Sequence, residues 1–273
     1  MRVCLSLLAI SLTLATGAAA APEVVVVPNG VLKLHALLFR PEGRGPFPAV
    51  LFNHGSGTPL ERQMAQASAL GPVFARHGYV FLFLFRRGSG LSASQGVSAA
   101  QRMDRELAVA GPEARNDLQL RLLENDHLSD ALAGLKRLRA LPGVDPARVS
   151  LAGHSFGASL TLLLLERDRA VRGAVAFAGS AASWEHSPQL RTRLLAAVGR
   201  AAAPIFFIQA ANDYSIAPAQ AISAEAARLG KTHQVKVYPA TGRTPDEGHD
   251  FVFREVGAWE PDVFAFLDGC MRP

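Results

Sequence analysis

The chain has 273 residues, of which 49% are hydrophobic and 19% are charged, and its formal net charge is +5. This is the composition of a globular protein with a large core. Basic residues are scattered, with Arg86-Arg87 as the longest basic run, and no aromatic residues alternate with them, so we do not expect nucleic-acid binding. The two cysteines, Cys4 and Cys270, provide no metal-binding cluster, and we expect no metal and no organic cofactor.

The first 21 residues have the pattern of an export signal. A short basic start, Met1-Arg2, precedes an apolar run from Leu5 to Leu14 and a stretch of small residues that ends at Ala21. A membrane anchor is the alternative, but the apolar run is shorter than the roughly 20 residues that span a bilayer. We therefore expect cleavage near Ala20 or Ala21, an exported protein that is periplasmic or secreted, and no stable membrane association after cleavage.

Buried strands and helices alternate along the rest of the chain. Short, uniformly apolar runs are typical of strands buried on both faces, whereas apolar residues three and four apart indicate helices. We expect strands at residues 23–27, 31–39, 49–52, 79–85, 149–152, 171–178, 205–210 and 233–238. We expect helices at residues 60–77, 117–141, 190–198, 217–229 and 260–267, and one directly after Ser155. The first two strands are expected to form an antiparallel hairpin at a sheet edge.

Four segments have sequence features beyond this simple alternation. The helix at residues 60–77 is expected to break around Gly71-Pro72, because proline lacks the backbone donor that a helix interior uses. Residues 91–115 are polar and alanine-rich, and two interpretations stay open: a lid over the site, or a solvated excursion. Residues 117–141 carry leucines at helical spacings and are expected to form one long amphipathic helix. Residues 245–249 are expected to form a loop.

The alternation of strands with helices of ten or more residues predicts an α/β fold, a mainly parallel sheet with helices on both faces. No internal repeat, low-complexity tract or linker interrupts the pattern. We therefore expect residues 22–273 to form a single domain, while its oligomeric state stays unknown. In such a sheet, ligands and chemistry collect beyond the carboxyl ends of the strands.

Chemically active side chains follow several of these strands. Ser155 lies in a Gly-His-Ser-Phe-Gly sequence, residues 153–157, between a buried strand and an apolar helix. This pattern typically holds a serine on a sharp turn with its hydroxyl exposed above the sheet edge. A helix N-cap is the alternative role of a serine at this position. Asp213 and His249 follow the last two strands, which produces the order nucleophile, acid, base.

A serine hydroxyl is a poor nucleophile unless an imidazole takes its proton, and the imidazole needs a carboxylate that fixes its orientation. We therefore expect Ser155 to be the nucleophile, His249 the general base and then acid, and Asp213 the orienting carboxylate. Asp246 and Asp250 are weaker candidates for that carboxylate.

The oxyanion of the tetrahedral intermediate needs two backbone donors. We expect them from Phe156, directly after the nucleophile, and from Ser56 in the His-Gly-Ser turn at residues 54–56. Arg86 and Arg87 follow another strand; they either bind an acidic substrate group or tie loops together, and we favour the second role. His54 is expected to pack beneath the turn.

Four short patches resemble the dienelactone hydrolase branch of the α/β-hydrolase fold. They are the elbow at residues 153–157, Asp213 after a late strand, Gly-His-Asp-Phe at residues 248–251, and Asn-His-Gly at residues 53–55. The resemblance extends over almost the whole chain after the signal. It implies an enzyme that cleaves small-molecule esters through an acyl-enzyme intermediate. Dienelactone hydrolases proper carry cysteine at the elbow, so the serine here implies a serine esterase of the same architecture.

Two other functions stay open. Peptidases of the prolyl oligopeptidase type share this catalytic domain, although they usually carry a large additional propeller domain. A non-catalytic binding protein is the second alternative, but such relatives typically lose a triad residue, and all three are present here.

Overall fold

The computed structural model of the protein describes residues 21–57 and 59–272. The expected export signal, apart from Ala21, lies outside the described residues. The described chain forms an eight-stranded sheet in the order β1-β2-β4-β3-β5-β6-β7-β8. Its strands are β1 (Glu23–Asn29), β2 (Leu32–Phe39), β3 (Phe47–Asn53), β4 (Val80–Phe85), β5 (Val144–His154), β6 (Ala174–Phe177), β7 (Ile205–Ala210) and β8 (His233–Tyr238).

The strand directions confirm the expected α/β fold. β2 pairs antiparallel with β1 and with β4, and all other neighbouring strands pair parallel. The antiparallel hairpin at the sheet edge is therefore confirmed. The carboxyl ends of β3, β5, β7 and β8 lie at the same edge of the sheet, since parallel strands share a direction, and the residues that follow them meet there.

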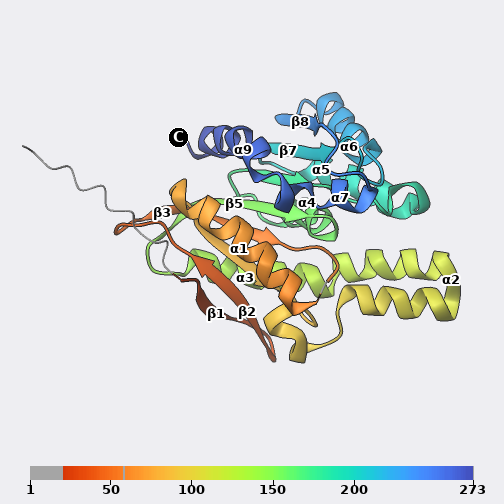
Figure 1. Ribbon diagram of the computed structural model, residues 1–273, viewed down its shortest axis with the longest axis horizontal. Coiled ribbons are helices and arrows are strands. Elements are labelled where there is room, and N and C mark those ends of the chain that lie inside the picture. Colours follow the sequence, from red (N-terminus) through yellow and green to blue (C-terminus); the bar gives the residue numbers. More distant parts are fainter. Residues whose placement is uncertain (1–20, 58, 273) are drawn as a thin grey trace, which may run out of the picture.

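Helices cover both faces of the sheet (Figure 1). The helical elements are α1 (Leu60–Arg76), η1 (Gly90–Gln95), α2 (Ala99–Glu124), α3 (Asp126–Arg139), α4 (Phe156–Arg167), η2 (Trp184–His186), α5 (Pro188–Arg200), α6 (Ala217–Arg228), α7 (Pro245–His249), α8 (Phe251–Arg254) and α9 (Val256–Met271). One hydrophobic cluster joins the sheet to α3, α4, α5 and α6, and a second joins its opposite face to α1, α8 and α9.

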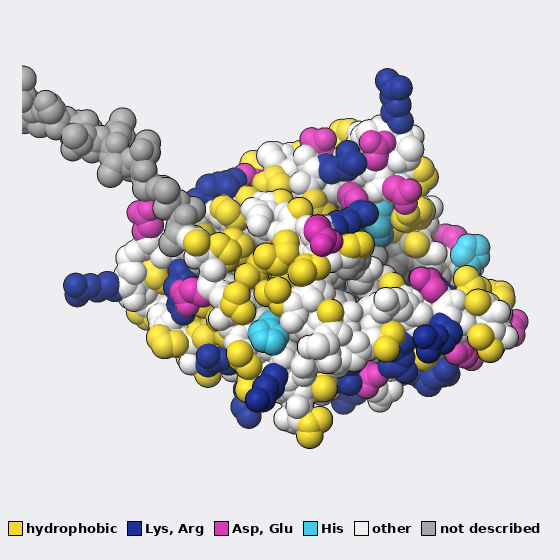
Figure 2. Space-filling model, turned by 60° about the horizontal axis from the view of Figure 1, so that its bottom comes forward, with side chains coloured by type: hydrophobic (Ala, Val, Ile, Leu, Met, Phe, Trp, Pro, Cys, Tyr) yellow, Lys and Arg dark blue, Asp and Glu magenta, His cyan; other side chains and the backbone are white. Residues whose placement is uncertain are grey.

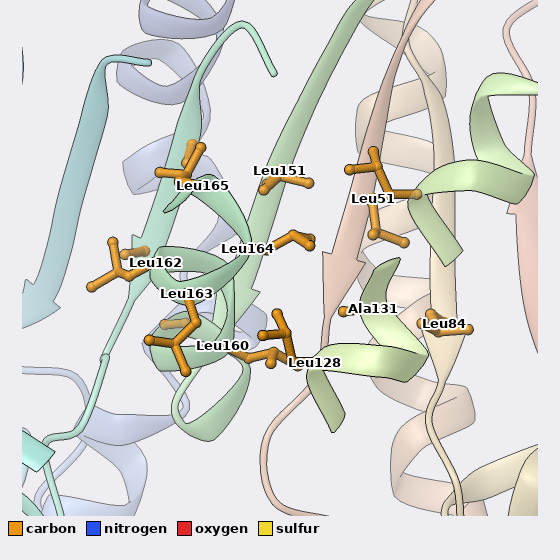
Figure 3. Packing of buried hydrophobic residues seen from close by; sticks show 14 of the residues in the cluster. Leu51, Leu84, Leu128, Ala131, Leu151, Leu160, Leu162, Leu163, Leu164 and Leu165 are labelled. Carbon is orange, nitrogen blue, oxygen red and sulfur yellow. The ribbon is translucent and has the colours of Figure 1, made fainter. Parts of the chain in front are cut away.

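Helix α4, which follows Ser155, is the centre of the first cluster. All ten residues from Phe156 to Leu165 are buried, because α4 lies between β5 and the neighbouring helices. Its leucines pack toward Leu151 of β5 and Leu128 of α3 (Figure 3). Full burial of a leucine side chain stabilises a fold by about 1.5–3 kcal/mol, so these contacts hold the start of α4, and with it Ser155, in a fixed position.

The expected break in the first helix is wrong. Helix α1 runs without interruption from Leu60 to Arg76 with Pro72 inside it. Gly71 lies against the ring of Phe39 in β2, and a Cβ atom at Gly71 would come within 2.3 Å of that ring. The close approach of α1 to the sheet therefore requires glycine at this position. Burial of the helix outweighs the loss of the backbone hydrogen bond that Pro72 cannot donate.

The long helix expected at residues 117–141 is also wrong, because the chain leaves helical geometry at Asn125 (φ −114°, ψ −85°) between α2 and α3. Leucines on both sides of Asn125 pack into the same hydrophobic cluster, so the apolar spacing gives no sign of the interruption. Helix α2 itself begins at Ala99 and reverses at Gly111 (φ 86°). Its two arms lie side by side and extend beyond the sheet (Figure 1).

The loop expected at residues 245–249 is a single helical turn, α7. Its start carries a capping box: the Thr244 hydroxyl accepts from the backbone N–H of Glu247, and the Glu247 carboxylate accepts from the backbone N–H of Thr244. This pair of hydrogen bonds fixes the segment that leads to His249. The sequence signal of this turn is the capping pattern itself, Thr followed three residues later by Glu.

Charges of both signs are interspersed on the face that Figure 2 shows. No helix among the described residues is long and apolar enough to cross a membrane.

Candidate active site

Ser155 lies on the sharp turn between β5 and α4. Its backbone angles are φ 56° and ψ −121°, a conformation that costs a residue with a side chain on the order of 1–3 kcal/mol. The residue occupies the N-cap position of α4, but its hydroxyl makes no capping hydrogen bond. A Cβ atom at Gly157 would lie 2.0 Å from the carbonyl oxygen of Asn53, so only glycine allows this turn to pack against β3. The strained turn thus leaves the hydroxyl free for chemistry.

His249, at the end of α7, contacts Asp213 after β7. The Nδ1 atom of His249 is 2.8 Å from Oδ1 of Asp213, whose side chain is fully buried. Asp213 also accepts hydrogen bonds from the backbone N–H of Tyr214 at 2.7 Å and from the amide of Gln209 at 3.2 Å. A carboxylate only accepts, so Nδ1 carries the proton and Nε2 of the neutral ring is left as a proton acceptor.

Ser155 and His249 line one cavity of about 430 Å³. Asp213 lies behind His249 and does not line it. The two weaker carboxylate candidates have other partners: Asp246 accepts from the hydroxyl of Tyr214, and Asp250 forms an ion pair with Arg62 of α1.

The turn that follows β3 lies over the serine. Gly55 and Ser56 line the cavity, and a Cβ atom at Gly55 would be 3.7 Å from the Cβ of Ser155. The guanidinium of Arg86 donates to the carbonyl oxygens of His54 at 2.7 Å and Gly55 at 2.5 Å. The carbonyl of Gly55 and the N–H of Ser56 belong to one trans peptide group and point in opposite directions. The Ser56 N–H therefore points away from Arg86.

The second expected donor is the backbone N–H of Phe156, in the first turn of α4. The first four N–H groups of a helix have no partner inside the helix, so this one is available to a ligand. The ring of Phe156 lies under the guanidinium of Arg86, 5.6 Å from ring centre to Cζ. Arg86 thus contacts both segments that carry the expected oxyanion donors, Ser56 and Phe156.

The structural role expected for the two arginines is confirmed. Arg86 is completely buried, and burial lowers the pKa of its guanidinium to about 9, so it stays charged at neutral pH. Arg87 forms ion pairs with Asp126 and Asp130 of α3. Neither arginine lines the cavity, and so neither reaches a substrate group there.

His54 packs beneath the turn, as expected. Its ring stacks on Phe83 and its Nε2 atom accepts from the backbone N–H of Arg86 at 3.2 Å. Burial, and next the charge of Arg86, hold the pKa of His54 well below its usual value. The ring is therefore neutral, and it links β4 to the turn.

His154 has a role that the sequence did not reveal. Its Nε2 atom lies 2.8 Å from the backbone carbonyl oxygen of His249, to which it donates. Burial, and next the nearby His249, keep the pKa of His154 well below its usual value. The residue before the nucleophile thus anchors the segment that carries His249. In the sequence, only the position of His154 directly before Ser155 indicated that it lies at this site.

The segment at residues 91–115 contributes no described residue to the cavity wall. It contains η1 and the first arm of α2. Its contact with the site is indirect: the backbone N–H of Ala100 donates to the carbonyl of Ser56 at 3.0 Å. The segment therefore supports the turn after β3 from outside and does not cover the cavity as a lid would. Among the described residues, no group of His, Cys, Asp and Glu side chains is arranged to hold a metal ion.

Comparison with known proteins identifies relatives of this chain. Esterase EstD of Thermotoga maritima is 30% identical over 161 residues, which make up 59% of this chain and 34% of EstD. This chain thus spans about a third of the length of that relative.

Two solved structures share the fold. An acylaminoacyl peptidase of Pyrococcus horikoshii superimposes with a TM-score of 0.66 at 18% identity, over 94% of this chain and 42% of the peptidase. An esterase of Pyrococcus furiosus superimposes with a TM-score of 0.64 at 16% identity, over 92% of this chain and 91% of the esterase. The sequence model of the dienelactone hydrolase family matches residues 34–255. The chain therefore belongs to the dienelactone hydrolase family and has the α/β-hydrolase fold.

Proposed function

We propose that the protein is a serine hydrolase that cleaves carboxylic ester bonds of small molecules through an acyl-enzyme intermediate. One observation carries this proposal. His249 is hydrogen-bonded to the buried carboxylate of Asp213 at 2.8 Å, and it shares a cavity with Ser155, whose hydroxyl caps no helix. Membership in the dienelactone hydrolase family and the likeness to EstD support an ester as the substrate.

Each residue has a defined part in the reaction. Nε2 of His249 takes the proton of Ser155 as Oγ bonds to the ester carbonyl carbon, and Asp213 stabilises the imidazolium that forms. The oxyanion accepts hydrogen bonds from the N–H groups of Phe156 and Ser56, each of which lowers the barrier by roughly 3 kcal/mol. The bond to the alcohol oxygen breaks, and His249 gives its proton to the leaving alcohol. Water, activated by His249, then releases the acid and restores Ser155.

The test is hydrolysis of 4-nitrophenyl acetate by the parent protein and by Ser155→Ala. We expect the variant to lose at least 99.9% of the parent kcat, since removal of a triad member costs on the order of 10⁴-fold or more. Ser94→Ala is the matched control, because Ser94 is exposed in η1 and does not line the cavity. A fluorophosphonate should label the parent and not Ser155→Ala. Parent-like hydrolysis by Ser155→Ala would refute the proposal.

A proline-amide substrate in the same assay tests the peptidase alternative. The ester should be hydrolysed faster than the amide, and faster turnover of the amide would favour a peptidase. Failure of the fluorophosphonate to label folded parent protein would favour a non-catalytic binding protein.

We also propose that the protein is exported, as a periplasmic or secreted protein, after removal of the first 21 residues. Support comes from the basic start, the short apolar run and the small residues before the first strand. N-terminal sequencing of the protein purified from its native host would test the position of cleavage.

A further inference from the structure

The wall of the active-site cavity has an unusual composition. None of the described residues that line it is Leu, Ile, Val, Met or Phe. Pockets for small molecules are commonly lined mainly by apolar side chains. Each methylene of an acyl chain buried against such a wall improves binding by about fourfold. A long acyl chain would find no such surface in this cavity.

The wall next to His249 consists of polar side chains with planar hydrogen-bonding groups. Arg62 and Asp250 form an ion pair there, and Arg254 lies 3.5 Å from Glu247. These pairs stay partly open to solvent: half of the side-chain surface of Arg254 is exposed, and about a third of that of Glu247. Guanidinium and carboxylate groups have several donors and acceptors each, so each pair retains hydrogen-bonding capacity for a ligand.

Two further side chains complete this wall. The ring of Tyr214 lies 5.1 Å from the ring of His249, and Tyr214 is about half exposed at 47%. It offers a flat apolar face beside its hydroxyl. Gln66 of α1, one helical turn after Arg62, also lines the cavity and is otherwise buried. A ligand in the cavity is thus surrounded by amide, carboxylate and guanidinium groups with one aromatic ring.

The position of His249 determines which part of the ester lies against this wall. Since His249 gives its proton to the leaving alcohol, the alcohol must lie on the His249 side of the cavity. Vicinal hydroxyl groups both donate and accept, and so they match neighbouring guanidinium and carboxylate groups. We propose that the substrate is an ester of a short acyl group, such as acetyl, with a hydroxyl-rich alcohol of the sugar or polyol class.

This assignment rests on the proposed esterase function and names its substrate class. In the reaction, Oγ of Ser155 bonds to the carbonyl carbon of the acetyl group, and its proton passes to His249. The bond from that carbon to the sugar oxygen then breaks, and the sugar oxygen takes the proton held by His249. Water then cleaves the acetyl-serine ester and releases acetate. No oxidant, reductant or metal is needed for this balance.

The experiment compares two acetates of primary alcohols that carry a six-membered ring. Methyl 6-O-acetyl-glucopyranoside has hydroxyl groups on the ring, and cyclohexylmethyl acetate has none. Acetate release gives kcat/KM, and each value is divided by the rate of hydroxide hydrolysis of the same ester, which removes the difference in leaving-group reactivity. We expect the corrected value to be at least tenfold higher for the glucoside. A ratio below three would overturn the assignment.

Variants locate the preference in the cavity wall. Gln66→Leu and Arg254→Met should each reduce the ratio by about tenfold, since each removes hydrogen bonds to the alcohol and adds apolar surface. Gln189→Leu is the matched control, because Gln189 is exposed at the start of α5 and lies outside the cavity wall. Arg254 is half exposed, so Arg254→Met keeps the test valid even if Gln66→Leu fails to fold. An unchanged ratio in Arg254→Met would contradict the assignment.

A second arm varies the acyl group. The kcat/KM for 4-nitrophenyl octanoate should be at least tenfold lower than for 4-nitrophenyl acetate, and a higher value for the octanoate would overturn the short-acyl part. Failure of the esterase function itself looks different. In that case neither acetate is hydrolysed above the level of Ser155→Ala. If only the substrate assignment fails, hydrolysis still depends on Ser155, but the corrected kcat/KM is the same with and without hydroxyl groups on the alcohol.

Discussion

Arg86 offers a direct test of how the turn after β3 is held in place. Its buried guanidinium donates to the carbonyl oxygens of His54 and Gly55 at 2.7 and 2.5 Å. Hydrogen bonds from a charged group contribute about 1.5–3 kcal/mol each, and the removal of a buried charge offsets part of that loss. We therefore expect Arg86→Met to lower the free energy of unfolding by about 3 kcal/mol.

The same substitution should also impair catalysis. Without the hydrogen bonds from Arg86, the N–H of Ser56 loses its fixed direction. Loss of one oxyanion donor reduces kcat by roughly 10²–10³-fold. KM should change little, because this donor acts mainly on the oxyanion of the transition state. Steady-state hydrolysis of 4-nitrophenyl acetate, with folding checked by circular dichroism at the assay temperature, measures both constants.

Arg87→Met is the matched control for Arg86→Met. Arg87 pairs with Asp126 and with the buried Asp130, and it does not contact the turn after β3. Its loss should destabilise the protein by about 3–5 kcal/mol, because Asp130 is left buried without its charged partner, yet kcat of the folded variant should stay within threefold of the parent. A folded Arg86→Met protein with kcat within threefold of the parent would refute the proposed role of Arg86 in holding the turn. An equal loss of kcat in Arg87→Met would refute it as well.

Two further predictions concern histidine protonation. Asp213→Asn should lower kcat by about 10³–10⁴-fold in the same assay, because an amide can hold His249 in the wrong tautomer; a loss below tenfold would show that another group orients the ring. Burial keeps the pKa values of His54, His127 and His154 well below 6.5 in the folded protein. The unfolded chain therefore binds more protons than the folded protein below pH 6.5. As the pH is lowered through this range, the free energy of unfolding should decrease by up to about 1.4 kcal/mol per pH unit for each histidine. Urea unfolding at pH 7.5 and 5.5 checks this; equal stability at both values would contradict it.

Local sequence patterns predicted the parts of the fold that depend on local interactions. Uniform apolar runs located the strands of the sheet, and glycine on both sides of Ser155 located the elbow. The break at Asn125 has no such local signal, because leucines on both sides of it pack into one cluster. At Gly71-Pro72 the local pattern predicted a break, but contact between α1 and Phe39 keeps the helix intact.

The sequence by itself determined the alternation of strands and helices, the elbow at Ser155 and the order of Asp213 and His249 after it. These features follow from backbone preferences and from the spacing of apolar residues, which act over a few neighbouring positions. Only the tertiary structure decided that Asp213 contacts His249, that Arg86 holds the turn after β3, and that the cavity wall is polar. Those contacts join residues from strands and helices far apart in the chain, and no local pattern records how the packed sheet brings them together.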